Sequence, residues 1–217
     1  MIAVVGLAAY RTTPDGQGTA GGLAVDVATE AVRQGAAAEL VGKVGDDGAG
    51  DGVVVGLGRL GIGHAAFLRD PTRPTPMIAF EPSDGGDDGD DSPVTTLVPT
   101  EASARPALEA GDVQLALRYL AEARVVVVVD RLTDAALGAA VEGAQFAGAR
   151  LIVLVPAGSP LPSVPAEATV LEAPPADDGS FGRVVGAFAA ALDSGMDPET
   201  AFGRAVERSG WEAVPDS

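Results

Sequence analysis

The sequence predicts a layered α/β domain whose helices flank a mainly parallel sheet. Two apolar runs, residues 125–129 and 151–155, lack the alternation of a half-exposed strand, which is typical of strands buried on both faces of a parallel sheet. Strand-like runs alternate with amphipathic helical patterns along the chain, as in βα units. The 217 residues are 47% hydrophobic, which is enough to bury a sizeable core and is unlike a disordered chain.

The expected strands are short apolar runs bounded by glycine, proline or polar residues. In chain order they cover residues 2–5, 38–41, 65–68, 77–80, 94–98, 125–129, 151–155 and 169–171. Four of them are expected in the central sheet, namely those at 2–5, 38–41, 125–129 and 151–155. The three short strands between residues 65 and 98 are expected to form a small β layer at its margin.

The expected helices carry an apolar stripe and begin or end at recognisable caps. In chain order they cover residues 21–34, 48–60, 112–121, 133–146 and 180–192, and a last helix begins at residue 197. The first two helices end at Gly35 and Gly61. The last one begins with an aspartate cap, Asp197, followed by proline in the first turn. The fifth has a stripe at helical spacing, formed by Phe181, Val184, Val185, Phe188 and Leu192.

Composition excludes several classes of protein. The chain has 31 acidic and 14 basic residues, a net charge of −17, which argues against nucleic acid and anionic membranes as partners. It has no cysteine, which excludes disulfide scaffolds, thiolate metal sites and cysteine nucleophiles. It also has no asparagine, a single lysine (Lys43) and a single histidine (His64). No leader sequence and no apolar run of about 18 residues is visible, so we expect a cytoplasmic protein.

We expect no metal site. Residues 83–92 form an acidic, low-complexity segment with five aspartates, but an EF-hand loop starting at Asp84 would have Gly86 at position 3 and Thr95 at position 12. We therefore interpret this segment as a solvated loop. His64 has no second histidine or cysteine beside it and is interpreted as a turn residue. The aspartates of the loop are Asp84, Asp87, Asp88, Asp90 and Asp91.

Three common enzyme motifs are missing. No G-x-S-x-G pentapeptide exists for the single histidine to serve, which excludes a hydrolase elbow. No G-x-x-x-x-G-K-[ST] sequence is present, since Lys43 is followed by Val44. The first strand continues as Gly6-Leu7-Ala8, which does not fit a dinucleotide fingerprint.

Several motifs in the first half nevertheless occur together in a recognisable order. A Gly21-Gly22 turn opens a helix, the segment at residues 41–50 reads V-G-K-V-G-D-D-G-A-G, and residues 69–75 read R-D-P-T-R-P-T. In order and spacing these resemble the ribokinase-like (PfkB) family of sugar and nucleoside kinases. The resemblance covers most of residues 1–155 and resumes at residues 186–188 and the closing helices. It implies a single ribokinase-like domain over residues 1–217, with a small β lid and dimerisation layer at residues 65–98.

The resemblance also identifies a catalytic segment, and there the sequence departs from the family. The family reads D-x-x-G-A-G-D, whose glycines and helix start hold the transferred phosphate and whose last aspartate is the general base. The corresponding residues 176–182 read A-D-D-G-S-F-G. The base position falls on Gly182, and Phe181 replaces a phosphate-loop glycine; Gly179 and Ser180 complete the remnant of that loop. A shift of register would bring Asp177 or Asp178 to the base position.

The sugar-binding and nucleotide-binding motifs depart as well. The N-x-D pair that contacts sugar hydroxyls falls on Ala9 and Arg11, and G-G-K-G-x-N becomes G-G-L-A-V-D, ending at Asp26. Only about ten residues separate Tyr10 from the Gly-Gly turn, too few for the family's usual lid strands there. The N-x-x-E motif that helps hold Mg²⁺ cannot exist without asparagine. Residues 151–155 lead almost directly to the closing helices, so we expect the nucleotide half to be truncated.

Two functions remain open at this point. The first is a pseudoenzyme of this fold that has lost phosphotransfer and acts as a small-molecule-binding or assembly module, with a small polyol or nucleoside as the possible ligand and no cofactor. The second is an active ATP-dependent sugar or nucleoside kinase with altered phosphate chemistry, which would need ATP and Mg²⁺. Candidate substrate-binding residues are Gly21, Gly22, Asp26 and Lys43. Each also has a structural reading, as a helix start, an exposed helix residue or a strand-end charge, and Asp46-Asp47-Gly48 reads as a helix cap. A homodimer is expected through the lid strands.

Overall fold

The computed structural model describes residues 1–12, 18–81, 94–98, 104–174 and 179–209. Its central feature is a six-stranded sheet in the order β10-β9-β8-β1-β4-β5, in which all neighbours are parallel. The strands are β1 (Ile2–Val5), β4 (Ala38–Gly45), β5 (Phe67–Asp70), β8 (Val125–Val128), β9 (Arg150–Pro156) and β10 (Thr169–Ala173). The predicted parallel α/β sheet is confirmed, including all four strands expected in it.

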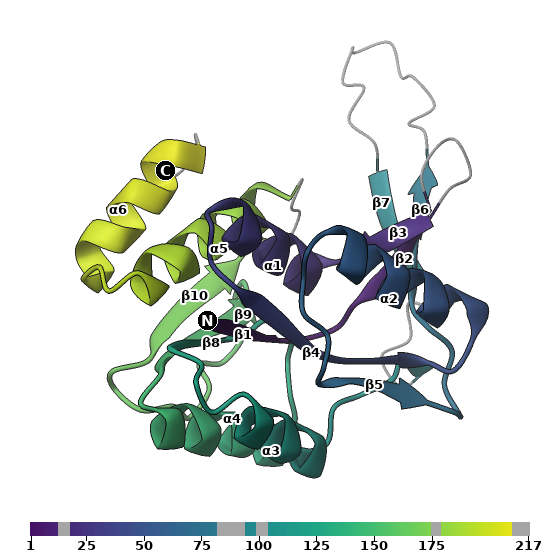
Figure 1. Cartoon of the computed structure of the whole chain (residues 1–217), viewed down its shortest axis with the longest axis horizontal. Helices are drawn as coiled ribbons and strands as arrows, with labels where there is room; N and C mark the ends of the chain where they lie inside the picture. The colour runs from purple at the N-terminus through teal and green to yellow at the C-terminus, as the bar shows by residue number, and fades with distance from the viewer. Residues whose placement is uncertain (13–17, 82–93, 99–103, 175–178, 210–217) are drawn as a thin grey trace.

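Helices cover both faces of this sheet (Figure 1). One face packs against α1 (Leu23–Arg33), α2 (Gly48–Arg59) and α5 (Ser180–Asp193), and α6 (Pro198–Ser209) packs on α5. The other face packs against α3 (Ala110–Tyr119) and α4 (Asp134–Ala147). Strand alternation divides the core accordingly: Ile2 and Val4 belong to the first layer, and Ala3 and Val5 belong to the second. All four side chains have no exposed surface, so the central strands are buried on both faces as their composition predicted.

The small β layer differs from the prediction. It is a four-stranded sheet in the order β3-β2-β6-β7, built from β2 (Ala9–Thr12), β3 (Gly18–Gly21), β6 (Met77–Glu81) and β7 (Val94–Val98). The run expected as a lid strand at 65–68 becomes β5, which pairs with β4 in the central sheet. The strands β2 and β3, where the sequence analysis expected no strand, pair antiparallel from Ala9↔Gly21 to Thr12↔Gly18. Helix α2 packs against both strands of this hairpin and so stabilises strands of only four residues each.

Glycines on α2 explain how the hairpin packs so closely. A Cβ at Gly52 would lie 2.4 Å from the Tyr10 ring, and one at Gly56 would lie 2.5 Å from the Ala20 nitrogen. Only a hydrogen atom fits at these two positions, and the glycines therefore allow β2 and β3 to pack closely against the helix backbone. The prediction that too few residues were present for lid strands in this part of the chain was therefore wrong, because this support lets four-residue strands pair.

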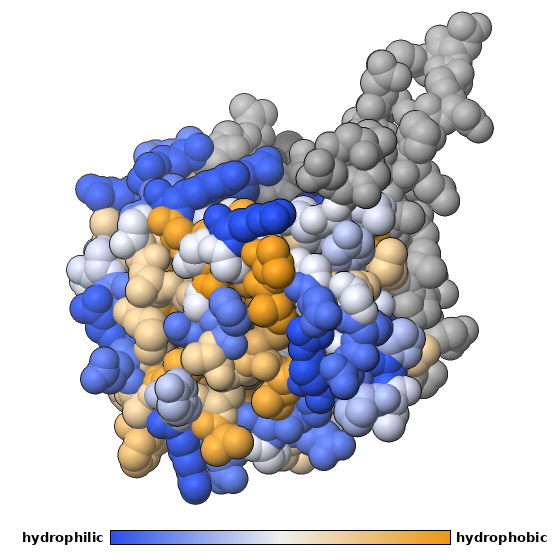
Figure 2. All heavy atoms as spheres, turned by 45° about the vertical axis from the view of Figure 1, so that its right-hand side comes forward, coloured by the Kyte–Doolittle hydropathy of each residue, from blue (hydrophilic) through white to orange (hydrophobic). Residues whose placement is uncertain are grey.

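The second half of the chain is short between β9 and α5. The described residues of this connection contain one further strand, β10, which pairs in parallel with β9 from Ile152↔Thr169 to Pro156↔Ala173. Asp177, Asp178 and the acidic segment at residues 83–92 lie outside the described residues. No helix among the described ranges is long and apolar enough to cross a membrane. On the face in Figure 2, apolar residues are interspersed with hydrophilic ones.

Candidate functional site

The sheet order places a crevice between β1 and β8. From β1 the chain builds first towards β4 and β5 and later, on the other side, towards β8, β9 and β10. In open α/β sheets ligands bind outside the carboxyl ends of the strands at such a reversal of strand order. The residues that follow β1 and β8, Gly6-Leu7 and Val129-Asp130, therefore line the expected binding region.

Asp130 is an ionisable residue of this crevice. Its carboxylate accepts a hydrogen bond from the Leu7 backbone N–H, and a Cβ at Gly6 would lie 3.0 Å from its Oδ2. Burial raises the pKa of Asp130 above its usual value, although the Leu7 N–H bond and the charge of Arg105 oppose the rise. A carboxyl with a raised pKa in a crevice is a candidate binding or acid–base group.

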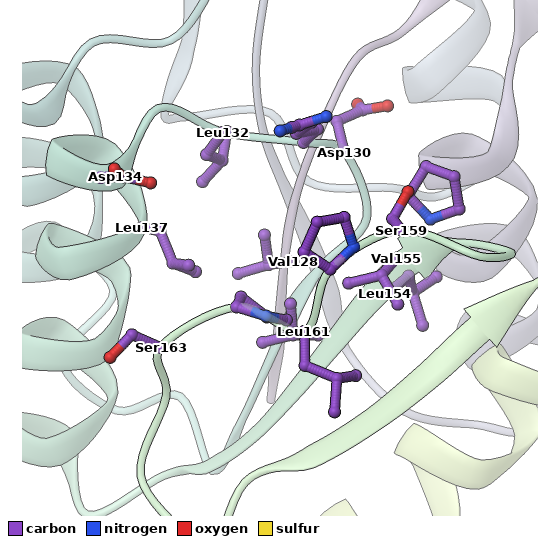
Figure 3. Close-up of a pocket in the computed structure, with 15 residues that line it drawn as sticks. Val128, Asp130, Leu132, Asp134, Leu137, Leu154, Val155, Ser159, Leu161 and Ser163 are labelled. Atoms are coloured by element: carbon purple, nitrogen blue, oxygen red, sulfur yellow. The ribbon is translucent and has the colours of Figure 1, made fainter.

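Two cavities lie on opposite faces of the sheet, at the carboxyl ends of its strands. Both are lined by Asp130, Arg131, Val155 and Pro156. The first, of ≈ 210 Å³, lies on the α4 side and has apolar walls that include Val128 and Leu137. Figure 3 shows the Asp130 carboxylate turned away from the centre of this cavity. The second, of ≈ 390 Å³, lies on the α1 side, where Leu23 and Pro174 line it. The carboxylate direction and the helix start at Leu23 favour the second cavity as the ligand site; apart from Asp130 and Arg131, its lining residues are apolar.

The start of α1 carries three of the predicted substrate-binding residues. Gly22 caps the helix with φ 103°, a backbone conformation that favours glycine. A Cβ at Gly21 would lie 2.8 Å from Arg11 Nε, so this glycine makes room for the arginine side chain. Arg11 in turn approaches Asp26 in the first turn of α1, with 3.4 Å between Nη2 and Oδ2. The structure therefore brings Gly21, Gly22 and Asp26 together with Arg11.

The start of α5 packs against the same turn of α1. Gly179 caps α5 with φ 87°, Ser180 is its first residue, and the Phe181 side chain is 3% exposed and belongs to the core. Gly182 is buried, and a Cβ there would lie 2.9 Å from the Asp26 Cβ. One turn later, a Cβ at Gly186 would lie 2.4 Å from the Val27 carbonyl oxygen. These two glycines, four residues apart on one face of α5, allow the two helix backbones to approach closely.

The motifs that carry the resemblance form a hydrogen-bonded clamp at the β4–α2 turn. Asp47 caps α2, as predicted, by accepting from the Gly50 N–H at 2.8 Å, and it accepts from the Thr75 hydroxyl at 2.6 Å and amide at 2.9 Å. The Thr75 hydroxyl also accepts from the Gly45 N–H, and Arg69 donates to the Gly45 carbonyl at 3.1 Å. Thr75 is 2% exposed. These five residues, called the clamp below, tie the start of α2 to the segment that enters the lid strand β6.

The clamp sets the charge state of its aspartate. Partial burial alone would raise the pKa of Asp47, but the hydrogen bonds from Thr75 and Gly50 and the positive charge of Arg69 outweigh it and lower the pKa below its usual value. Asp47 therefore has a structural role as a carboxylate, and its oxygens accept hydrogen bonds from Gly50 and Thr75.

Lys43 lies apart from the crevice. Its Nζ is 2.6 Å from Asp112 Oδ2, and the two side chains are 15% and 24% exposed. Asp112 also accepts from the Glu109 N–H in the capping box of α3, on the opposite side of the sheet from α1. The structure therefore gives this lysine a role in holding α3 to β4, and it does not bring it near Arg11 or Asp26.

Sequence analysis missed Asp130, which lines both cavities, and the contact between Arg11 and Asp26 at the start of α1. Asp130 follows directly after a doubly buried strand, which is the position where parallel strands present ligand-binding groups, and this signal was available. The role of Arg11 depends on the β2–β3 hairpin, which was not predicted. Among the described residues, no group of three or more His, Cys, Asp or Glu is arranged to hold a metal ion.

Comparison with known proteins adds evidence about the fold. No family model matches the sequence, and no curated protein matches it. Solved structures do match in shape. A PfkB protein from Polaromonas aligns with a TM-score of 0.70 and 14% identity over 96% of this chain and 94% of the other. Ribokinase from Arabidopsis thaliana, complexed with ribose and ATP, aligns with a TM-score of 0.65 and 16% identity, covering 96% and 90% of the two chains.

A further match is a putative ribokinase II from E. coli in complex with ATP and Mg²⁺, with a TM-score of 0.66 and 16% identity over 94% of this chain and 89% of the other. At these identities the matches establish architecture alone. They confirm the fold that the sequence resemblance implied. The protein thus has the ribokinase-like α/β fold of the PfkB carbohydrate kinases.

Proposed function

We propose that this protein binds a small hydroxylated molecule in the crevice between β1 and β8 and does not transfer phosphate to it. The fold supports a ligand site at the carboxyl ends of the strands, where Asp130 and Arg131 line an open volume next to the start of α1. A polyol or a nucleoside is the ligand class that the fold favours, because ribokinase-like neighbours of known structure include one bound to ribose.

The observation that carries the loss of phosphotransfer is the packing of Gly182. This residue stands where the resemblance places the general base, it has no side chain to accept a proton, and α1 occupies the space around it. Removing a positioned general base typically lowers a rate by about 10²–10⁴-fold. Phe181, at the neighbouring loop position, is buried in the core and does not leave an open glycine approach for a phosphate.

The start of α5, where the resemblance places the loop that holds the transferred phosphate, packs against α1 at Gly182 and Gly186. We therefore propose that ligand binding needs neither nucleotide nor Mg²⁺.

The test combines binding with turnover. Thermal shift and calorimetry with ribose, ribitol, fructose and adenosine, each with and without ATP·Mg²⁺, measure binding, and a coupled assay measures ADP. We expect binding of at least one acceptor without nucleotide, and no acceptor-dependent ADP formation. Stoichiometric ADP formation that is abolished by substitution of Asp177 or Asp178 would instead establish an active kinase using the shifted register.

Self-association is a second proposal that concerns the lid sheet. In the described part of the chain β3 and β7 are the edge strands of the four-stranded sheet, and uncovered edges favour pairing with another copy. Charge opposes association, because each chain carries −17. Salt screens exposed charges beyond about 8 Å at physiological ionic strength. Light scattering should therefore show a dimer whose fraction rises with salt, and a monomer mass at every salt concentration would refute it.

A further inference from the structure

The cavity on the α4 side of the sheet, called the α4 cavity below, is not used by the proposed function. Its volume is ≈ 210 Å³. Its wall includes Val128, Leu137, Val153 and Val155, which all belong to the apolar layer that α3 and α4 form with the sheet. An apolar cavity of about 150 Å³ accommodates a benzene molecule. The α4 cavity therefore has room for a hydrocarbon side chain of that size.

The connection between β9 and β10 forms the other side of the α4 cavity. Its residues Ser159 and Leu161 line the cavity, and in Figure 3 they lie across from Asp134 and Leu137 of α4. Three of residues 156–163 are prolines, whose rings fix φ and limit the freedom of this connection. Because this wall is already restricted, a ligand would need to order little of it on binding.

Two side chains of opposite charge, Arg131 and Asp134, line the α4 cavity without pairing. Within the described ranges, neither lies at ion-pair distance from the other or from another charged group, and both are exposed. The carboxylate of Asp130 is turned away from the centre of this cavity and accepts from the Leu7 N–H. The α4 cavity therefore presents one unpaired cation and one unpaired anion beside an apolar wall.

We propose that the α4 cavity binds an apolar α-amino acid, with its carboxylate on Arg131, its ammonium group on Asp134 and its side chain against Val128, Leu137 and Val153. The guanidinium fork matches a carboxylate in a two-bond arrangement. An amino acid has no net charge, so the −17 of the chain does not repel it as it repels a simple carboxylate. The proposal does not depend on the polyol site, which lies on the other face of the sheet.

L-Leucine and three molecules that each lack one of its groups are the probes. 4-Methylpentanoate lacks the ammonium group, 3-methylbutylamine lacks the carboxylate, and glycine lacks the side chain. Calorimetry at about 0.15 M salt limits nonspecific attraction of the amine to the acidic chain. We expect leucine to bind at least tenfold more tightly than each of the other three, because only leucine can contact both charged residues and the apolar wall.

Variants of the two charged residues identify the site. Arg131→Met and Asp134→Asn should each weaken leucine binding at least tenfold. Arg131→Met should not weaken binding of the amine, and Asp134→Asn should not weaken binding of 4-methylpentanoate, because each of these probes lacks the group that the lost charge would bind. Arg150→Met and Glu142→Gln are the matched controls, since both residues are exposed and line neither cavity, and they should leave leucine affinity unchanged.

Circular dichroism verifies that each variant is folded, and Arg131→Lys, which keeps the charge without the fork, should retain part of the affinity. Leucine binding no tighter than that of glycine or of either analogue, or unchanged in both cavity variants, would overturn the inference. Polyol binding without leucine binding would overturn this inference alone. Leucine binding without binding of any polyol or nucleoside would support it and overturn the proposed function.

Discussion

The turn at the start of α2 and the start of α5 are both helix N-termini whose motifs resemble the same family, yet they differ in what their residues do. At α2 the motif residues Gly45, Asp47, Gly50, Arg69 and Thr75 contact one another in the clamp. At α5 the corresponding motif has changed, and Gly182 contacts α1. The first motif is explained by structure alone, since its side chains bond to the protein itself.

The two motifs therefore differ in what they indicate about activity. The clamp holds the backbone between α2 and the lid and needs no ligand to explain it. At the start of α5, Gly182 packs against α1 and Phe181 is buried in the core. A strong match to the clamp therefore supports the fold and says little about catalysis.

The largest effect is expected from crowding the clamp. A Cβ at Gly50 would lie 2.3 Å from the Gly45 carbonyl oxygen and 2.5 Å from Arg69 Nη1, so Gly50→Ala should lower the free energy of unfolding by about 3 kcal/mol. Gly48→Ala in the same helix meets nothing within 4 Å and should change it little. Urea denaturation measures both free energies of unfolding. Equal stability of the two variants would mean that the clamp residues leave room for a side chain at position 50.

Crowding the α1–α5 contact should have the next largest effect. A Cβ at Gly186 would lie 2.4 Å from the Val27 carbonyl oxygen and 2.7 Å from the Glu30 Cβ, so Gly186→Ala should destabilise by about 2 kcal/mol. Gly138→Ala in α4 meets nothing within 4 Å and should stabilise by roughly 0.5–1 kcal/mol through helix propensity. If thermal unfolding instead shows Gly186→Ala to be stabilising, the helices are not in close contact there.

The clamp also predicts a pH dependence. The pKa of Asp47 is lowered in the folded protein from its usual value of 3.8, so its contribution to stability is complete above that pH and is lost as pH falls through the folded-state pKa. Asp47→Asn lacks this contribution and should be less stable at pH 7 by about 1 kcal/mol. The difference between the wild-type and variant unfolding free energies should shrink below pH 4, and a constant difference would contradict the role of the charge.

The smallest effect is expected for the ion pair on the opposite side of the sheet. Lys43→Met removes the partner of a partly exposed Asp112, which still caps α3, so the loss should be below about 1 kcal/mol and should decrease at high salt. Ligand binding in the crevice should not change. A large loss of ligand affinity, measured by calorimetry, would contradict this and show that Lys43 contributes to the binding site.

The elements of the central sheet were predictable, because doubly buried strands and amphipathic helices leave strong local patterns. The apolar residues at 2–5 and 125–128 are strands as expected, and Asp47 is the expected cap. The β2–β3 hairpin was not predictable from its own residues. Its stability depends on Gly52 and Gly56 of α2, which are distant in sequence. The Arg11–Asp26 pair was missed for the same reason, since it exists only once the hairpin forms.

The packing role of Gly182 is the central claim, and the unfolding free energy of Gly182→Ala tests it most directly. A Cβ there would lie 2.9 Å from the Asp26 Cβ and 3.3 Å from Leu23 Cδ1, so we predict a loss of about 1 kcal/mol. Gly203→Ala, in α6 with nothing within 4 Å, should instead stabilise by roughly 0.5–1 kcal/mol. If Gly182→Ala stabilises as much as Gly203→Ala, position 182 has room for a side chain, and the claim that helix packing has replaced the catalytic base is contradicted.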